Sequence, residues 1–260
     1  MTTDPWSVLT PHQAATARAF LAERAAERRH LVIYLSGAHA YGFPSPDSDL
    51  DLKCVHVAPT ASLLGLAPPA DSVERAPAIV DGVELDYSSH ELAHVLRGIV
   101  RGNGNYLERL LGDLVLGGDA ALLASARPIV RGLLSGRAAH HYGGFARSQL
   151  KLFDQKPTAK RALYVLRTCG TGRALLARGE LETDVARLAA FVPPEIDELL
   201  AIKRQAEQQV LDAAAVAAWR PRLLAAIAAV DTAPSILPPA PPPEALAAAD
   251  AWLVGVRLTR

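Results

Sequence analysis

Segments with strand character are confined to the first half of this chain, and this division constrains the fold more than any other feature of the sequence. Short runs of β-branched and aromatic residues indicate strands at 31–37, 50–57 and 78–89, the last as two short strands or one strand with a Gly-centred turn. Helical patterns lie before and after these runs, at 11–30 and from 89 to about 111. Beyond about residue 118 the expected elements are helices, at 119–135, 138–153, 157–178, 183–190, 194–210 and 214–230.

This pattern predicts an α+β protein with an α/β unit over residues 1–118 and a helical unit over 119–260. A proline-rich connector at 233–244, APSILPPAPPPE, precedes a last helix that ends in WLVGVRLTR. Proline-rich segments of this kind are usually extended and have no core of their own. The helical unit is therefore expected to end in a strap and one terminal helix.

The composition excludes several broad classes of protein. Half of the residues are hydrophobic and 21% are charged, which excludes a disordered polymer. The 27 basic and 27 acidic residues balance, which excludes a globally basic nucleic-acid coat but not a local basic patch. No uninterrupted apolar run reaches the ~18 residues of a membrane span, and the N-terminus lacks the pattern of a secretory signal. We therefore expect no membrane partner and a cytoplasmic location, with Cys54 and Cys169 as reduced thiols.

The segment SGAHAYGFPSPDSDLDLK, residues 36–53, carries the strongest chemical signal. Asp49 and Asp51 are two apart at the start of a strand, so their side chains point to the same side, where they repel each other unless a cation lies between them. Hard divalent ions such as Mg²⁺ bind such oxygens together with substrate phosphates. Upstream, Gly37 and Gly42 flank a turn whose backbone N–H groups can approach a phosphate. A third carboxylate is Asp86, in VELDY, which could share the metal and accept a proton if its strand lies beside that of Asp51.

The order of these features resembles a known family. A strand, then G-x(4)-G-F-x-S-P-D-S-D-x-D, then a strand with a third Asp is similar to the minimal nucleotidyltransferases of the DNA polymerase β superfamily, and most of all to the YcgL-like group. The resemblance covers residues 30–111 well and the helical half more loosely. It implies a small mixed sheet with helices, and two Mg²⁺ ions (or Mn²⁺) held by Asp49, Asp51 and Asp86. It also implies transfer of a nucleoside monophosphate from an NTP, with release of pyrophosphate.

The phosphate turn departs from the superfamily pattern at one position. Gly37 is followed by Ala38, where the superfamily usually has Ser or Gly, so a hydroxyl that would bond the triphosphate is missing. Such a bond is worth about 1.5–3 kcal/mol, which corresponds to about 10–100-fold in NTP affinity unless another residue compensates. His39 or a basic residue of the helical half is a candidate for that role. We assign the nucleotide to Ser36, Gly37, His39, Ser48, Lys160, Tyr164 and Arg167.

The last three of these residues come from a basic segment. Between His141 and Arg178 the only acid, Asp154, accompanies many Lys and Arg residues. Lys160, Tyr164 and Arg167 share one helical face, which would close over the carboxylates with its cations on the phosphates and its tyrosine on the base. The same patch would suit the backbone of an RNA or DNA acceptor. The alternative is a solvated helix face.

A competing motif is HELAH, residues 90–94, which matches the H-E-x-x-H helix of zinc metalloproteases. It lies at the start of an expected helix with Ser88 and Ser89 as the cap, and Glu108 is the nearest downstream acid for a third ligand. The alternative is a pair of surface histidines. Downstream, the resemblance implies that Asn105 and Glu108 in GNGNYLERL brace the carboxylate site; the alternative is a plain inter-helix turn.

Three hypotheses therefore remain. The first is a Mg²⁺-dependent nucleotidyltransferase that acts on an RNA 3′ end, a protein hydroxyl or a small molecule. A role in RNA repair would be inferred from the family that the chain resembles, not from these residues. The second is a non-catalytic nucleotide-binding module, which Ala38 suggests. The third is a zinc peptidase that uses HELAH.

Overall fold

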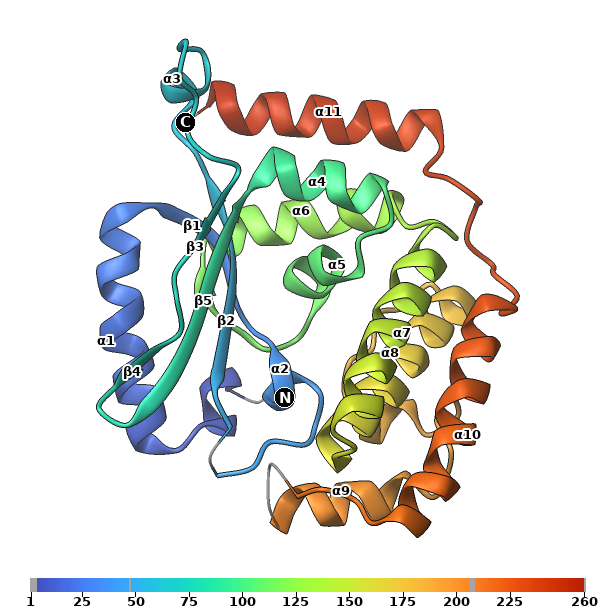
Figure 1. Ribbon diagram of the computed structural model, residues 1–260. Coiled ribbons are helices and arrows are strands. Elements are labelled where there is room, and N and C mark those ends of the chain that lie inside the picture. The colour runs from blue at the N-terminus through green and yellow to red at the C-terminus, as the bar shows by residue number, and fades with distance from the viewer. Residues whose placement is uncertain (1–3, 47, 206–208, 260) are drawn as a thin grey trace.

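The computed structural model describes residues 4–46, 48–205 and 209–259. Its centre is a six-stranded sheet with the order β3-β5-β2-β1-β6, and β4 pairs with β5 (Figure 1). The β2–β5 pair is parallel and the other pairs are antiparallel, so the sheet is mixed. The strands are β1 (Arg29–Leu35), β2 (Leu50–Val57), β3 (Ser72–Glu74), β4 (Ala78–Val80), β5 (Val83–Glu91) and β6 (Val115–Gly118).

Helices flank this sheet and, within the described residues, are the main elements after β6, as predicted, although the helix expected over 183–190 is only a short 3₁₀ turn. The α-helices are α1 (Pro11–Glu27), α2 (Gly37–Ala40), α3 (Thr60–Leu63), α4 (Leu92–Val100), α5 (Gly104–Leu111), α6 (Ala120–Gly132), α7 (Ala138–Gln155), α8 (Ala159–Arg178), α9 (Ile196–Gln205), α10 (Ala213–Asp231) and α11 (Pro243–Leu258). Two 3₁₀ turns, Pro5–Val8 and Val185–Leu188, accompany them. The fold class is α+β with an α-helical C-terminal half, which confirms the prediction. The predicted helix over 194–210 extends into residues 206–208, which lie outside the described residues.

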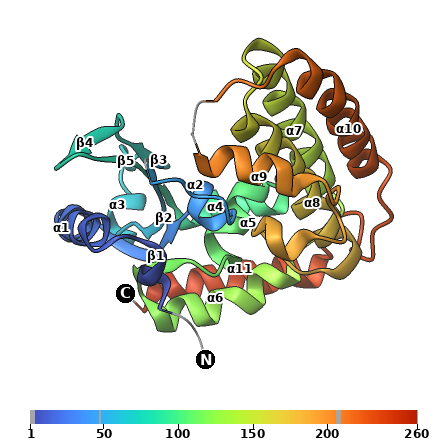
Figure 2. The ribbon, with the colours of Figure 1, turned by 90° about the horizontal axis from the view of Figure 1, so that it is seen from below.

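The alternation of β2 decides which side of the sheet carries the carboxylates. Leu50, Leu52 and Cys54 are buried in a cluster that includes residues of α1. Val55 and Val57 belong instead to the larger cluster that includes α4, α5 and the helical half. Because side chains alternate along a strand, Asp51 and Lys53 lie on the same side as Val55. Figure 2 shows α1 on one side of the sheet and α7, α8 and α10 on the other, so the carboxylates face the helical half.

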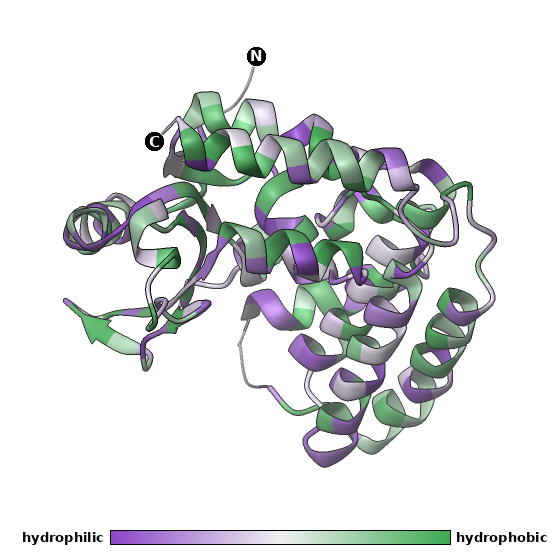
Figure 3. Ribbon diagram, turned by 90° about the horizontal axis from the view of Figure 1, so that it is seen from above, coloured by the Kyte–Doolittle hydropathy of each residue, from purple (hydrophilic) through white to green (hydrophobic). Residues whose placement is uncertain are grey.

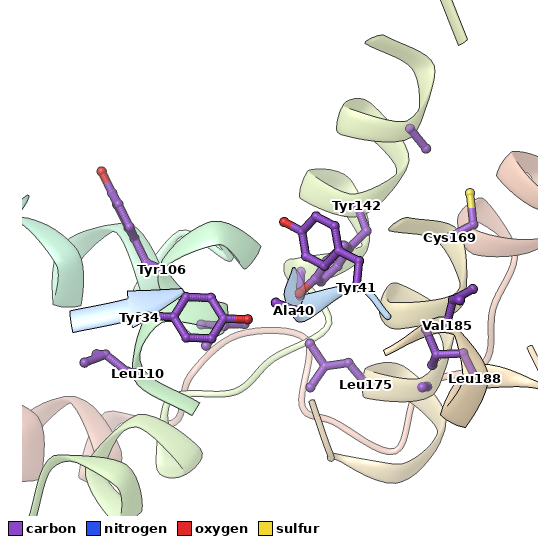
Figure 4. Packing of buried hydrophobic residues seen from close by; sticks show 14 of the residues in the cluster. Tyr34, Ala40, Tyr41, Tyr106, Leu110, Tyr142, Cys169, Leu175, Val185 and Leu188 are labelled. Atoms are coloured by element: carbon purple, nitrogen blue, oxygen red, sulfur yellow. The ribbon is translucent and has the colours of Figure 1, made fainter. Parts of the chain in front are cut away.

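The larger core cluster runs from the sheet into the helical half without a break. In Figure 4, Tyr34 of β1 lies near Ala40 and Tyr41, which lead on to Tyr142 of α7 and to Leu175 of α8. In Figure 3 hydrophilic and hydrophobic bands alternate along these helices, as expected when one side of each helix is buried. This packing holds α8 against the segment that joins β1 to β2.

The C-terminal helix returns to the first half of the chain. Helix α11 packs along α6 (Figures 1 and 2), and the Arg257 guanidinium lies 2.9 Å from Glu91 Oε1 at the end of β5. The proline-rich connector is an extended strap that is hydrogen-bonded to the helical half, with Ile236 N donating to Leu176 O at 2.9 Å. The division of the chain at residue 118 stays a prediction.

Helix α10 is long and apolar enough to cross a membrane, by length and composition only. In the structure it packs against α7 and α8, and Trp219 and Leu223 are buried there. Arg220, in its middle, lies 2.9 Å from Asp154 at the end of α7. These contacts are those of an outer helix in a bundle.

Two local predictions were wrong. The helix expected over 89–111 is two helices, and its first residues belong to β5, because Ser88–Glu91 pair in register with β2 and β3. Ser88 and Ser89 therefore cap nothing; the Glu91 carboxylate is the cap of α4 and accepts from Ala93 N at 2.7 Å. The strands β3 and β6, at the two ends of the strand order, were not predicted, since three and four residues are too short for periodicity.

Candidate active site

The predicted carboxylates lie at the start of two neighbouring strands. In the parallel β2–β5 pair, Asp51 is directly opposite Asp86. The Lys53 ammonium lies between them, 2.7 Å from Asp86 Oδ2 and 3.6 Å from Asp51 Oδ1. Burial raises the pKa of Asp51 to about 6, and the charge of Asp49 adds to the effect. The site is therefore crowded with negative charge, which one lysine partly neutralises.

The turn after β1 comes very close to this carboxylate. Gly37 has a φ of +65°, and a Cβ atom on it would lie 1.9 Å from Asp51 Oδ2. A side chain is therefore excluded at Gly37 on two grounds, the left-handed backbone and the collision. The Ser36 N–H donates to the Asp51 carbonyl oxygen at 2.8 Å, which fixes the turn to β2. The backbone of the turn is thus held directly against the second carboxylate, as expected for a phosphate turn.

A pocket of about 190 Å³ opens beside this turn. Ser36 lines the pocket, whereas Ala38 is 2% exposed and packs into the core. Position 38 therefore offers no hydroxyl to the pocket. The hydroxyl at the pocket wall is that of Ser36, which lies 3.3 Å from Tyr41 Oη. The residues around the pocket are Ser36, Gly37, Tyr41, Asp51, Lys53, Asn105, Glu108, Arg109, Phe145 and Tyr164.

Helix α8 contributes to the site, but not in the way its periodicity predicted. Tyr164 lines the pocket, with its ring edge-on to Tyr41 at 5.6 Å between centroids. Lys160 lies close enough to lower the pKa of Asp51, although burial of that carboxyl outweighs its effect. Arg167, which we expected on the phosphates, is 2% exposed and donates to Glu108 Oε1 at 2.7 Å. That assignment was wrong, because the guanidinium is already neutralised by a buried carboxylate.

Two other assigned residues lie away from the pocket. His39 is buried and lines a separate cavity of about 890 Å³ beside β6, together with Asp184. Ser48 is buried, and its hydroxyl accepts from Ser45 N at 2.9 Å, which closes the turn before Asp49. In this structure neither side chain lies at the pocket wall, so neither replaces the hydroxyl missing at Ala38.

Three pocket residues were missed by sequence reasoning. Tyr41 lies four residues after Gly37, and this helical spacing was a usable signal that Tyr41 is close to the site. Its Oη donates to Glu108 Oε2 at 3.2 Å. Phe145 of α7 and Arg109 of α5 carried no local signal, because only tertiary packing brings them to β2. Asn105 and Glu108, which were suggested as bracing residues, do line the pocket.

The HELAH segment does not have the geometry of a metalloprotease motif. His90 is the next-to-last residue of β5 and His94 is in the first turn of α4, so the pair does not share a helix. The His90 ring accepts from the Arg109 guanidinium at 2.5 Å, and His94 Nε2 is 2.9 Å from Tyr106 Oη. Glu91, the residue that would act as the base of a metalloprotease, is buried; its carboxylate accepts from Ala93 N and forms an ion pair with Arg257. These contacts explain the motif as structural.

The donor chemistry of the carboxylates suits a hard divalent ion. Within the described ranges no three His, Cys, Asp or Glu side chains converge closely enough to hold an ion by themselves. Mg²⁺, however, is usually held by one or two carboxylates, with waters and substrate phosphates in its other positions. Asp49 and Asp51 would supply the carboxylates, next to a turn that suits phosphate. Asp86 fits the same group once Lys53 releases it.

Comparison with known proteins identifies the family. A model of the RlaP family, described as RNA repair pathway DNA polymerase beta family, matches residues 14–254. The chain belongs to this family. It is 28% identical over 156 residues to an uncharacterized protein of Methanocaldococcus jannaschii, covering 59% of this chain and 63% of that protein. It is 32% identical over 135 residues to the uncharacterized protein YcgL of Bacillus subtilis, covering 51% of this chain and 50% of that protein.

A comparison with solved structures gives one alignment over most of the chain. The nucleotidyltransferase-like protein from Exiguobacterium sibiricum 255-15 aligns with 95% of this chain and 80% of its own, at 12% identity and a TM-score of 0.34. The chain spans no more than 63% of the length of the curated relatives it matches. Family membership supports a transferase of the nucleotidyltransferase type and confirms the resemblance found in the sequence.

Proposed function

We propose that this chain transfers a nucleoside monophosphate from an NTP to an acceptor hydroxyl, with Mg²⁺ or Mn²⁺ and with release of pyrophosphate. The observation that carries the proposal is the register of Asp51 opposite Asp86, with the Gly37 turn pressed against the Asp51 carboxylate. Only glycine at position 37 avoids a collision with the Asp51 carboxylate. Such a close approach of the turn to paired carboxylates is expected where a phosphate on the turn and a metal on the carboxylates must meet.

The residues of the chain divide the chemistry between them. The divalent metal, when bound, supplies positive charge to the phosphates and acidifies the acceptor hydroxyl. The acceptor oxygen forms a bond to the α-phosphorus, the bond to the β-phosphate oxygen breaks, and its electron pair leaves with pyrophosphate. Asp86 takes the proton of the acceptor hydroxyl, which requires that Lys53 first move from the carboxylate it now contacts. Gly37 and Ser36 hold the triphosphate, Lys160 adds charge, and Tyr164 stacks on the base.

The direct test is incubation with each α-³²P-labelled NTP and Mg²⁺ or Mn²⁺, with and without a short RNA. Asp49→Asn plus Asp51→Asn serves as the inactive control, and it keeps the side-chain volume. We expect label to move to RNA, to protein or to a small molecule in the wild type and not in the double variant. Label that moves equally in both would refute the assignment of the carboxylates.

A second candidate function is a nucleotide-binding module without turnover. Two observations favour it: Ala38 is buried in place of a phosphate-binding hydroxyl, and Lys53 occupies the proton acceptor Asp86. This function predicts Mg²⁺-dependent NTP binding by calorimetry with no pyrophosphate release. Pyrophosphate release at any rate above that of the Asp49→Asn, Asp51→Asn variant would exclude it.

A further inference from the structure

A second pocket lies next to the active-site pocket, and the charged residues of its lining are two arginines, Arg97 and Arg101. It has a volume of about 380 Å³ and is formed by α4, α5 and the start of α7. None of its described lining residues is acidic. The side chains that give it its character are His94, Arg97, Arg101, His140, His141 and Tyr106. We call it the basic pocket.

The two pockets share a wall. His141 lines the basic pocket and Phe145 the active-site pocket, and their rings are stacked, 6.1 Å between centroids with a 6° angle between planes. These residues are four positions apart on α7, about 6 Å along the helix axis. On the α5 side, the guanidinium of Arg109 in the active-site pocket lies 5.4 Å from the centroid of the Tyr106 ring in the basic pocket. A ligand can therefore reach both pockets by crossing a short aromatic wall.

The positive charge of this region is poorly neutralised by the chain itself. Arg101 has no carboxylate within ion-pair distance in the described part of the chain. Arg97 is 3.6 Å from Asp71, but both side chains are more than half exposed, and such a pair is weak. Arg109 is 8% exposed, and within the described residues its hydrogen bonds go to neutral groups, the Cys54 carbonyl, the His90 ring and the Ser88 hydroxyl. A buried cation without a carboxylate is costly, and a bound anion would offset that cost.

We propose that the basic pocket binds a backbone phosphate of a single-stranded nucleic-acid acceptor, whose terminal hydroxyl lies at the carboxylate site. The proposal rests on the proposed function and adds the acceptor class and its binding site. The rings that separate the two pockets are four positions apart on one helix, so adjacent nucleotides of one strand would occupy the two pockets. The stacked His141 and Phe145 rings give an acceptor base an aromatic surface. An acidic protein segment would use the charge but not the rings, and a small molecule would not span both pockets.

The basic face predicted on α8 does not offer this site. Of its arginines, Arg161 donates to the carbonyls of Leu152 and Lys156, and Arg173 donates to the Phe191 carbonyl at 2.9 Å. With Arg167 buried on Glu108 of α5, most of the arginine side chains of that helix are already held by contacts within the protein. The acceptor backbone is therefore placed on α4, α5 and α7 rather than on α8.

The test measures binding by fluorescence anisotropy of a 12-nucleotide RNA labelled at its 5′ end, from 50 to 300 mM NaCl. Arg97→Ala plus Arg101→Ala removes two exposed charges without touching the core. The matched control is Arg131→Ala, an exposed arginine of α6 that does not line the pocket. We expect the double variant to weaken binding at least tenfold and to reduce the salt slope by about 0.7, the value for one phosphate contact on a single strand. Arg131→Ala should leave both unchanged.

Two results would overturn the proposal: equal affinity and salt slope in the double variant and the wild type, or displacement of the RNA by polyglutamate as effectively as by unlabelled RNA. A DNA strand of the same sequence shows whether the 2′-hydroxyl is read, and either outcome with DNA agrees with a phosphate site. Mg²⁺–NTP binding, measured by calorimetry in the double variant, should be unchanged.

If the wild type binds RNA through this pocket but transfers no label, the proposed function fails and the pocket stands. If label moves to RNA equally well in the double variant, the pocket fails and the function stands.

Discussion

The buried pair between Arg167 and Glu108 offers the sharpest test of how the site is held together. The two side chains are 2% and 4% exposed, and the guanidinium nitrogen is 2.7 Å from the carboxylate oxygen. The same guanidinium lies 3.6 Å from the centroid of the Tyr41 ring. In Arg167→Met, Glu108 stays buried without its partner, which typically costs about 3–5 kcal/mol of unfolding free energy. Loss of the cation–π contact adds about 1 kcal/mol.

The assay is urea unfolding of Arg167→Met, Glu108→Gln and the double variant, followed by circular dichroism. We expect the double variant to be much less destabilised than the sum of the single variants, because it leaves no buried charge uncompensated. The control is Arg187→Met, whose pair with Asp113 is 62% and 80% exposed and which should cost less than about 1 kcal/mol. A cost below about 1 kcal/mol for Arg167→Met, or strict additivity in the double variant, would refute the reasoning.

Three further predictions concern the turn, the lysine and a buried histidine. Gly37→Ala should cost about 1–2 kcal/mol of unfolding free energy because the backbone at this position is left-handed. It should also lower activity about 100-fold, because the added Cβ displaces Asp51. The control, Gly144→Ala, adds a Cβ into open space and should have neither effect. Lys53→Met should raise Mn²⁺ affinity about tenfold without nucleotide, measured by calorimetry, since it removes the competing cation; weaker Mn²⁺ binding would contradict this role. Burial lowers the pKa of His30 to about 4 from 6.5, so the unfolded chain binds the extra proton in that range. Unfolding free energy should therefore fall by about 2 kcal/mol from pH 6.5 to 4 after solvent screening, and less steeply in His30→Gln, as denaturation at several pH values would show.

The sequence predicted the features of the site that depend on local geometry. Alternation along 50–57 places Asp51 and Lys53 on the side opposite Leu50, and the structure confirms it. The helical second half was predicted from the loss of strand character beyond residue 118. The place of Asp86 opposite Asp51 depended on the resemblance as well, because a parallel pairing across more than 30 residues leaves no local trace.

What the sequence did not predict is which charges meet across the fold. Helical spacing correctly put Arg167 on the same face as Lys160, but periodicity does not name the neighbour of that face. The neighbour is Glu108, 59 residues earlier in the chain, and it neutralises the guanidinium. In the same way, the HELAH pattern assumes that its helix begins at His90. The pairing of β5 with β2 and β3 extends the strand through Glu91 instead.

The state of each cation at the site follows from what neutralises it. Arg167 has a buried carboxylate of its own and so is part of the framework rather than a ligand for substrate. Lys53 is neutralised by the carboxylates that a metal would use, so its contact with Asp86 must exchange when metal and nucleotide arrive. In the part of the chain that the structure describes, the hydrogen bonds of Arg109 go to neutral acceptors while it lines the pocket, so we expect it to gain most from a bound anion. The order Arg167, Lys53, Arg109 therefore runs from structural to substrate-binding, and the effect of each substitution should move from stability to binding in that order.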